Sequence, residues 1–209
     1  MANEHVKYWD NFWGRHIEAE DVIIGNPERY KRIINFIWNR PQYFKLNKLD
    51  VGCGTCQYVF RIRNYTNHYV NVNNWRGVDL SKVAVKYAQS KGLRAKQADF
   101  LEWDTPLKFE CFTFWNSLEY FEDITRVAHK IDTLADKYFS VQGNVPLYKM
   151  KTNTDGSKRF LDIRSMSAFW DRLGLFNREY EVYGIDGYPY LLFEANNFQE
   201  LSKTIEDLA

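Results

Sequence analysis

Short strand-like segments alternate with amphipathic helix-like segments between Phe44 and Val141, and no other feature of the sequence constrains the fold as much. The pattern predicts strands near 44–51, 75–79, 93–98, 109–115 and 138–141, with helices beginning near Gln57, Ser81 and Thr125. Strand–helix–strand units of this kind build a parallel sheet with helices on both faces. We therefore expect an α/β fold that contains a Rossmann-like, doubly wound, mostly parallel sheet.

The segments on either side of this alternation complete the predicted fold. Two helices should precede it, one over Val6–Ile17 and one that begins at Asn26-Pro27. A helix over Ser165–Leu173 and a hairpin around Asp186-Gly187 should follow, so that an antiparallel C-terminal hairpin brings the sheet to seven strands. We expect a single domain over 1–209, made of a helical cap (1–40), a core (44–195) and a C-terminal helix (196–209).

Composition excludes several classes of protein. The 28 basic and 27 acidic residues give a net charge of +1, which argues against binding nucleic acid or a membrane surface through bulk charge. No apolar run approaches the roughly 20 residues that span a bilayer, and Met1–Asp21 does not resemble a signal peptide. We therefore expect a cytoplasmic protein. The sequence does not indicate an oligomeric state.

The cysteines do not predict a metal site. Cys53 and Cys56 form a C-x-x-C pair, but Cys111 and the four scattered histidines offer no second pair of ligands. A redox pair remains an alternative. The interpretation we favour is that this spacing is incidental to a glycine loop, and that no metal is bound.

Three turns follow three consecutive predicted strands, and each carries an acidic residue. The first is Asp50-Val51-Gly52-Cys53-Gly54-Thr55, where glycines allow close approach to a ligand at the start of a helix. Asp79 ends the second strand, where a carboxylate suits the two hydroxyls of a ribose. Asp99-Phe100 follows the third strand, where an acid can accept from an exocyclic amine and an aromatic ring can pack against a base. Together they predict a pocket for an adenosine-containing ligand.

On these residues, the chain resembles the class I S-adenosylmethionine-dependent methyltransferases over roughly Lys45–Val141. Asp50–Gly54 resembles the D-x-G-x-G loop of that family, and the segment 109–123 resembles the fourth-strand motif of its small-molecule branch. Two positions depart from the family pattern: Cys56 replaces the third loop glycine, and Tyr120 replaces a histidine.

The resemblance implies S-adenosylmethionine as the cofactor and a set of residues that bind it. This set consists of Asp50, Gly52, Cys53, Gly54, Gln57, Asp79, Leu80, Asp99, Phe100 and Asn116. A nicotinamide dinucleotide is the less favoured ligand, because the pattern G-x-G-x-x-G would require glycine at Gln57.

Methyl transfer mainly requires alignment of the acceptor, and a general base only when the acceptor is protonated. The sequence shows no compelling base; the weak candidates are Tyr120, Glu119 and His16. Candidates for contact with the acceptor are Tyr8, Trp9, Trp13, Tyr148 and Lys149, although helix packing is the better explanation of the aromatic residues. Asn116-Ser117 lacks the rest of an N-P-P-Y motif, which disfavours methylation of adenine or of a glutamine amide.

We expect an enzyme that methylates an oxygen or nitrogen atom of a small molecule. Two alternatives stay open. The first is a non-catalytic S-adenosylmethionine-binding module or partner subunit, suggested by Cys56 and Tyr120. The second, which is weaker, is a nucleic-acid methyltransferase, whose binding should weaken steeply as salt rises.

Overall fold

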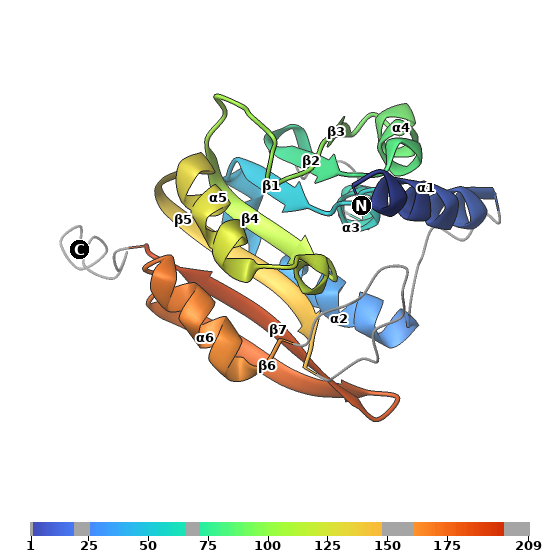
Figure 1. Cartoon of the computed structure of the whole chain (residues 1–209). Coiled ribbons are helices and arrows are strands. Elements are labelled where there is room, and N and C mark those ends of the chain that lie inside the picture. The colour runs from blue at the N-terminus through green and yellow to red at the C-terminus, as the bar shows by residue number, and fades with distance from the viewer. Residues whose placement is uncertain (1, 19–25, 66–71, 148–160, 199–209) are drawn as a thin grey trace.

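A computed structural model describes residues 2–18, 26–65, 72–147 and 161–198. Its centre is a seven-stranded sheet in the order β3-β2-β1-β4-β5-β7-β6 (Figure 1). The strands are β1 (Lys48–Val51), β2 (Trp75–Asp79), β3 (Arg94–Gln97), β4 (Phe109–Trp115), β5 (Ala135–Pro146), β6 (Asn177–Ile185) and β7 (Tyr188–Asn196). Six of them run in one direction, and β7 is antiparallel to both β5 and β6. The predicted fold class is confirmed.

Helices cover both faces of the sheet (Figure 1). One face packs against α2 (Pro27–Trp38), α3 (Gln57–Tyr65) and α4 (Lys82–Ser90), and the other against α5 (Ile124–Leu134) and α6 (Ile163–Arg172). Short 3-10 turns lie at η1 (Pro41–Lys45), η2 (Val72–Asn74) and η3 (Leu118–Tyr120). The core under α5 and α6 is built from apolar side chains such as Phe112, Phe114 and Trp170.

The first helix, α1 (Ala2–Glu18), lies beside the carboxyl ends of β1, β2 and β4 and contacts α4 (Figure 1). It begins four residues earlier than the predicted Val6. Because ligands of open α/β sheets bind beyond the carboxyl ends of the strands, α1 lies over the edge where the site is expected.

Local signals set several boundaries as the sequence predicts. Ser81 caps α4 by accepting from the Ala84 N–H at 3.1 Å, and Asn26 caps α2 by accepting from the Glu28 N–H at 2.8 Å. The Asp186-Gly187 turn has φ of 52° and 78°, as a two-residue hairpin turn of type I′ requires.

Other boundaries differ from the prediction. The strand predicted near 44–51 begins only at Lys48, because residues 41–45 form η1. β5 runs over twelve residues rather than four, because it pairs with β4 on one side and β7 on the other. The C-terminal helix is predicted to begin at Asn196, but that residue ends β7 and residues 197–198 are not helical; the remaining part of the predicted helix, 199–209, lies outside the described residues. The single-domain division stays a prediction. None of the described helices has the length and apolar character needed to cross a membrane.

Candidate functional site

The strand order places the topological switch point of the sheet at the carboxyl ends of β1 and β4. The chain leaves β1 toward β2 on one side, while β4 pairs with the other side of β1, so the connections diverge there. Such a switch point is where ligands bind in sheets of this kind. The turns after β1, β2 and β4 follow the carboxyl ends of neighbouring parallel strands at this point.

The loop after β1 is held down by backbone bonds and by close packing. The N–H groups of Gly52 and Cys53 donate to the Val78 carbonyl at 2.9 and 3.2 Å. Gly52 has φ +66°, and a Cβ there would lie 2.6 Å from the Ser117 Cβ. Gly54 has φ +52°, and a Cβ there would clash with the indole of Trp13 from α1. Only glycine fits these two positions, and α1 covers the loop directly.

Asp79 joins this loop to the start of α4. Its Oδ2 accepts from the Gly54 N–H and its Oδ1 from the Ser81 N–H, both at 2.8 Å. Asp10 from α1 adds a second carboxylate, which accepts from the Ser81 hydroxyl at 2.7 Å and the Val83 N–H at 3.1 Å. Burial raises the pKa of the Asp79 carboxyl, the hydrogen bonds from the Ser81 and Gly54 N–H groups lower it, and the charge of Asp10 raises it further. Each Asp79 oxygen retains a lone pair that can accept from a ribose hydroxyl.

Asp50 is buried in the middle of β1. Its Oδ1 accepts from the Thr113 hydroxyl at 2.8 Å. Burial raises the pKa of this carboxyl to about 7, opposed by the Thr113 bond and by the charge of Lys48. A nearby cationic group would favour its ionised form.

The third acidic turn differs in part from the prediction. Asp99 is exposed just beyond β3, and its Oδ1 accepts from the Leu101 N–H at 2.9 Å. The Phe100 ring, however, is buried in the core, with its centroid 6.2 Å from that of Phe114 and 6.0 Å from that of Phe121. The expectation that this ring packs against a base is therefore wrong, and Phe100 can meet a base only through its main chain.

Sequence reasoning did not single out Thr55 as a binding residue. Its side chain is 2% exposed, and its Oγ1 has no hydrogen-bond partner within the described parts of the chain. A buried hydroxyl without a partner is costly unless a ligand or water completes it. The available signal was a hydroxyl residue inside the glycine loop.

A chain of hydrogen bonds surrounds Asn116, which directly follows β4 and has φ +57°. The Tyr183 hydroxyl donates to Asn144 Oδ1 at 2.5 Å, and Asn144 Nδ2 donates to Asn116 Oδ1 at 2.7 Å. Asn116 Nδ2 donates in turn to the Tyr58 hydroxyl at 2.9 Å. Apart from Asn116, these residues were missed, because their proximity depends on sheet order rather than on local spacing.

The remaining cofactor candidates lie in the same turns. Gln57 is half-buried at the start of α3, where its carbonyl accepts from Tyr30 at 3.5 Å. Leu80 is half-buried after Asp79. Cys53 is buried, and so is Cys56, which has φ +56°, a conformation that favours the glycine of the family pattern.

The candidate bases occupy different environments. Glu119 is fully buried in η3, and the Tyr120 ring lies 5.0 Å from that of Trp9. His16 is bound through Nδ1 to the carbonyl of Phe12, one turn earlier in α1, at 2.7 Å. None of these arrangements identifies a base. Among the described residues, no group of three metal-ligating side chains is present.

The proposed acceptor contacts fall into two groups. Trp9 and Trp13 face the site from α1, against Tyr120 and Gly54 respectively. The Tyr8 ring packs edge to face against Trp9, with their centroids 5.1 Å apart. The predictions for Tyr148 and Lys149 lie outside the described residues.

The sequence matches a family model described as a methyltransferase domain over residues 49–136. No curated protein sequence matches the chain significantly. Solved structures that share the fold include 1,6-didemethyltoxoflavin-N1-methyltransferase from Burkholderia thailandensis, with bound 1,6-didemethyltoxoflavin and S-adenosylhomocysteine (TM-score 0.68, 15% identity, covering 95% of this chain and 91% of that one). Magnesium protoporphyrin IX methyltransferase from Synechocystis PCC 6803, with S-adenosylmethionine, has a TM-score of 0.66 at 13% identity, over 93% and 97% of the two chains. N-methyltransferase NodS from Bradyrhizobium japonicum has a TM-score of 0.61 at 14% identity, over 92% and 100%.

Proposed function

We propose that this chain is a class I S-adenosylmethionine-dependent methyltransferase and that it methylates an oxygen or nitrogen atom of a small-molecule acceptor. The observation that carries the proposal is the carboxylate of Asp79, which accepts from Gly54 and so links the glycine loop to the end of β2. This arrangement supports a nucleoside pocket at the switch point of the sheet.

Each turn of the site has a proposed partner in the cofactor. Asp79 would hold the ribose hydroxyls, and Asp99, with the main chain of Phe100, the adenine amine and ring. The loop 52–55 would approach the methionine end, where the hydroxyl of Thr55 could complete its missing hydrogen bond. Asp50 would supply a carboxylate near the positive charge of that end.

S-adenosylmethionine supplies, when bound, an electrophilic methyl group and a neutral thioether leaving group. The chain therefore has to orient the acceptor in line with that methyl and to exclude water, which can lower a barrier by several kcal/mol, up to about 7–11 in favourable systems. Trp9 and Trp13 on α1 are suited to the second task, because they cover the loop after β1 and the turn after β4.

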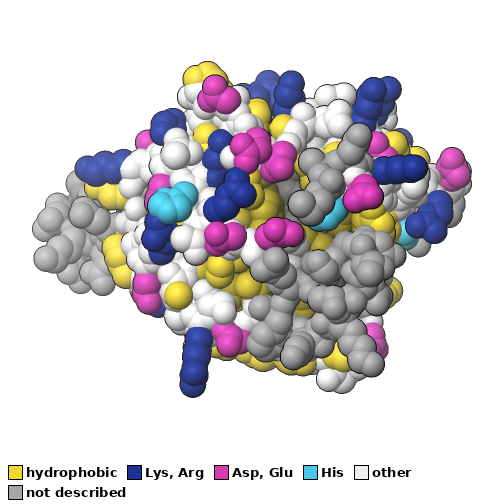
Figure 2. All heavy atoms as spheres, viewed as in Figure 1, with side chains coloured by type: hydrophobic (Ala, Val, Ile, Leu, Met, Phe, Trp, Pro, Cys, Tyr) yellow, Lys and Arg dark blue, Asp and Glu magenta, His cyan; other side chains and the backbone are white. Residues whose placement is uncertain are grey.

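The small-molecule acceptor is supported by two observations. The named enzymes that share the fold over nearly their whole lengths act on a didemethyltoxoflavin and on a porphyrin. Basic and acidic side chains are also interspersed on the face shown in Figure 2, as the balanced composition indicates. We retain a cytoplasmic location as part of the proposal, because three cysteines are too few and too odd in number for a disulfide framework.

A non-catalytic S-adenosylmethionine-binding module is the second candidate. Cys56 has φ +56°, which a non-glycine residue adopts at a cost of roughly 1–2 kcal/mol, in the loop that approaches the cofactor. A cofactor site that tolerates this strain could serve binding without turnover.

Calorimetric titration with S-adenosylmethionine and S-adenosylhomocysteine tests cofactor binding, and release of S-adenosylhomocysteine over an acceptor panel tests turnover. Asp79→Ala should weaken cofactor binding by about 1–3 kcal/mol, the usual loss for buried charge-assisted hydrogen bonds. Asp162→Ala is the matched control, since Asp162 accepts from the Ser165 N–H at 2.7 Å as the N-cap of α6 in the other helix layer. Equal affinity in both variants would contradict the assigned ribose site. Binding without turnover on any acceptor would favour the module.

A further inference from the structure

Three arginines of the N-terminal cap, Arg29 and Arg32 on α2 and Arg40 just after it, meet the β6–β7 hairpin, and their electrostatic partners differ. Arg32 pairs with Glu28 at 3.3 Å and with Glu181 at 2.8 Å. Arg40 pairs with Glu179 at 3.0 Å and with Glu194 at 2.8 Å. Arg29 has no carboxylate partner among the residues that the structure describes.

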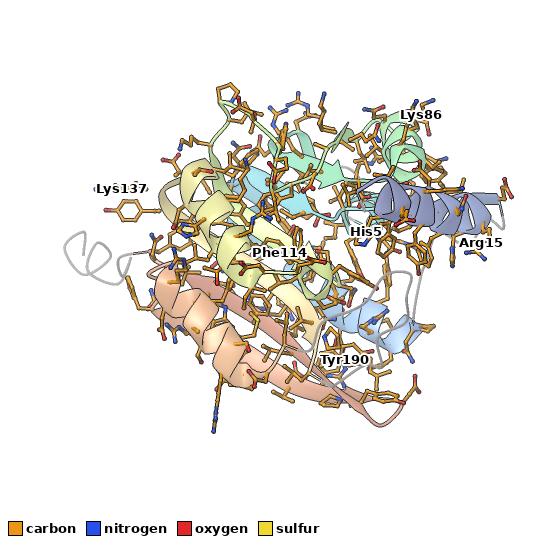
Figure 3. All side chains as sticks on the ribbon, viewed as in Figure 1. His5, Arg15, Lys86, Phe114, Lys137 and Tyr190 are labelled. Atoms are coloured by element: carbon orange, nitrogen blue, oxygen red, sulfur yellow. The ribbon has the colours of Figure 1, made fainter. Side chains whose placement is uncertain are left out.

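Arg29 is half-buried against aromatic side chains. Its guanidinium carbon lies 5.4 Å from the ring centroid of Tyr190, and Nη1 lies 3.5 Å from the Tyr190 hydroxyl. A guanidinium has five N–H donors, and among the described residues this one long contact leaves most of them for another acceptor. Tyr190 is visible in Figure 3, between α2 and the hairpin.

Within the described part of the chain, the groups next to Arg29 do not neutralise its charge. The charge of Arg29 acts on the hydroxyls of Tyr58 and Tyr183, but burial raises the pKa of both phenols above the usual value, so both stay neutral at physiological pH. Neutral hydroxyls and amides offer dipoles to a ligand without competing for the guanidinium.

The surroundings of Arg29 connect to the methyl-transfer site. Tyr183 begins the hydrogen-bond chain that passes through Asn144 and Asn116 to Tyr58. Asn116 precedes Ser117, whose Cβ meets Gly52 of the glycine loop. The cation therefore lies along the same carboxyl edge, on the side away from Asp79 and β3.

We infer that Arg29 binds an anionic group of the acceptor, a carboxylate or a phosphate, so that the substrate is a small organic acid methylated on a separate atom. The planar fork of a guanidinium matches two oxygens of either anion. This inference rests on the proposed methyl transfer, and it places Arg29 as a residue that determines specificity rather than one that performs chemistry.

The test uses the full chain and paired acceptors: hydroxybenzoates and catechol carboxylates, each beside its methyl ester or amide, and the corresponding aryl phosphates. Binding is measured by calorimetry to protein saturated with S-adenosylhomocysteine, and turnover by release of S-adenosylhomocysteine. The acids should bind and react in preference to the corresponding methyl esters and amides. Comparison of the carboxylates with the aryl phosphates identifies which anion Arg29 binds.

Arg29→Gln should raise KM for the acid that reacts best by roughly 10- to 100-fold, with a much smaller change in kcat, since the lost contact is made equally before and during transfer. Arg29→Lys should recover part of the loss. Arg32→Gln is the matched control on the next turn of α2, and it should leave KM within about twofold.

Three results would overturn the inference: methyl esters and amides that react as well as the acids, acids that do not bind, or an unchanged KM in Arg29→Gln. S-adenosylmethionine affinity, measured on the same preparations, keeps this outcome separate from failure of the proposed function, because Arg29 lies away from the proposed nucleoside pocket.

Discussion

Replacement of Asp50 by asparagine should make the protein more stable and at the same time weaken its binding of S-adenosylmethionine. Asp50 is 5% exposed in the central strand, and burial raises the pKa of its carboxyl from 3.8 to about 7. The folded state therefore holds a proton between these two pH values that the unfolded state releases. It follows that the free energy of unfolding falls as pH rises from about 4 to 7 and then levels off.

The size of the effect follows from that pKa difference. A shift of about three units corresponds to about 4 kcal/mol at pH 8, taking 1.36 kcal/mol per unit. An amide keeps the shape and can still accept from the Thr113 hydroxyl, but it gives up the attraction to Lys48. We therefore expect Asp50→Asn to gain roughly 2–4 kcal/mol at pH 8 and almost nothing near pH 4.

Urea unfolding of both proteins at pH 4.5, 6 and 8 measures this difference. Thr113→Val is the companion variant: it removes the bond that favours the ionised carboxylate, so it should destabilise the protein more at pH 8 than at pH 4.5. Parallel pH profiles for wild type and Asp50→Asn would refute the claim that an ionised Asp50 destabilises the fold.

Cofactor binding gives the functional half of the test. A cationic ligand near Asp50 favours the ionised form, so the wild-type affinity should fall as pH drops below about 7. Asp50→Asn should bind about 5- to 100-fold more weakly at pH 8 and lose that pH dependence. Affinity that is equal in the two proteins would place the methionine end of the cofactor elsewhere.

Further perturbations test other parts of the structure. Gly54→Ala should abolish most cofactor affinity, measured by calorimetry, because the new methyl group displaces the indole of Trp13. Gly174 also has a left-handed backbone but open space around it, so Gly174→Ala should lose only roughly 1–2 kcal/mol of stability in urea unfolding, from backbone strain, and keep its cofactor affinity. Lys48→Met should raise the free energy of unfolding by about 1–3 kcal/mol at pH 7, and by less as pH rises toward 10. The reason is that burial lowers the pKa of Lys48, which has no ion pair among the described residues. A drop in the thermal midpoint of the variant would contradict this. Arg40→Ala should destabilise the protein by about 3–5 kcal/mol, since it leaves the buried carboxylate of Glu194 without its cation, and unchanged unfolding in urea would show that this pair does not anchor the cap.

Much of the fold could be predicted because its signals are local. The segment 109–115 is almost wholly apolar, and it forms β4 with those bounds. Ser81 and Gly92 mark the ends of α4, where Gly92 has φ +75°. The acidic turns lie at strand ends, and the direction of a parallel sheet alone brings Asp50 and Asp79 to the same edge.

The failures come from interactions between distant segments. β5 contains Ser140, Gln142 and Asn144, a polar run that does not look like a central strand. It is stable in the interior because β4 and β7 complete its backbone bonds and because Tyr183 and Asn116 bind the Asn144 amide. Nor does the local sequence at Asp99-Phe100 indicate that the Phe100 ring points into the core, because its packing partners Phe114 and Phe121 come from more distant segments.

The two helices of the cap are held by different contacts, and these contacts match the different parts that we propose for them: α1 covers the cofactor loops, and α2 carries Arg29 for the acceptor. α2 is fixed to the hairpin by Arg40, whose partner Glu194 also accepts from the Tyr43 hydroxyl, so that buried charge and hydrogen bonds anchor it. The contacts of α1 are instead made with the site itself: Asp10 binds the start of α4 and Trp13 covers Gly54. Since those same loops are the ones proposed to meet the cofactor, the position of α1 depends energetically on what occupies them, whereas α2, and with it Arg29, is held chiefly by the hairpin and touches the proposed cofactor residues through Tyr30, at the Gln57 carbonyl. An α2 that is anchored beside the acceptor and an α1 whose position responds to the cofactor suit methyl transfer, because that reaction mainly requires that the acceptor be aligned with the methyl group and that water be excluded.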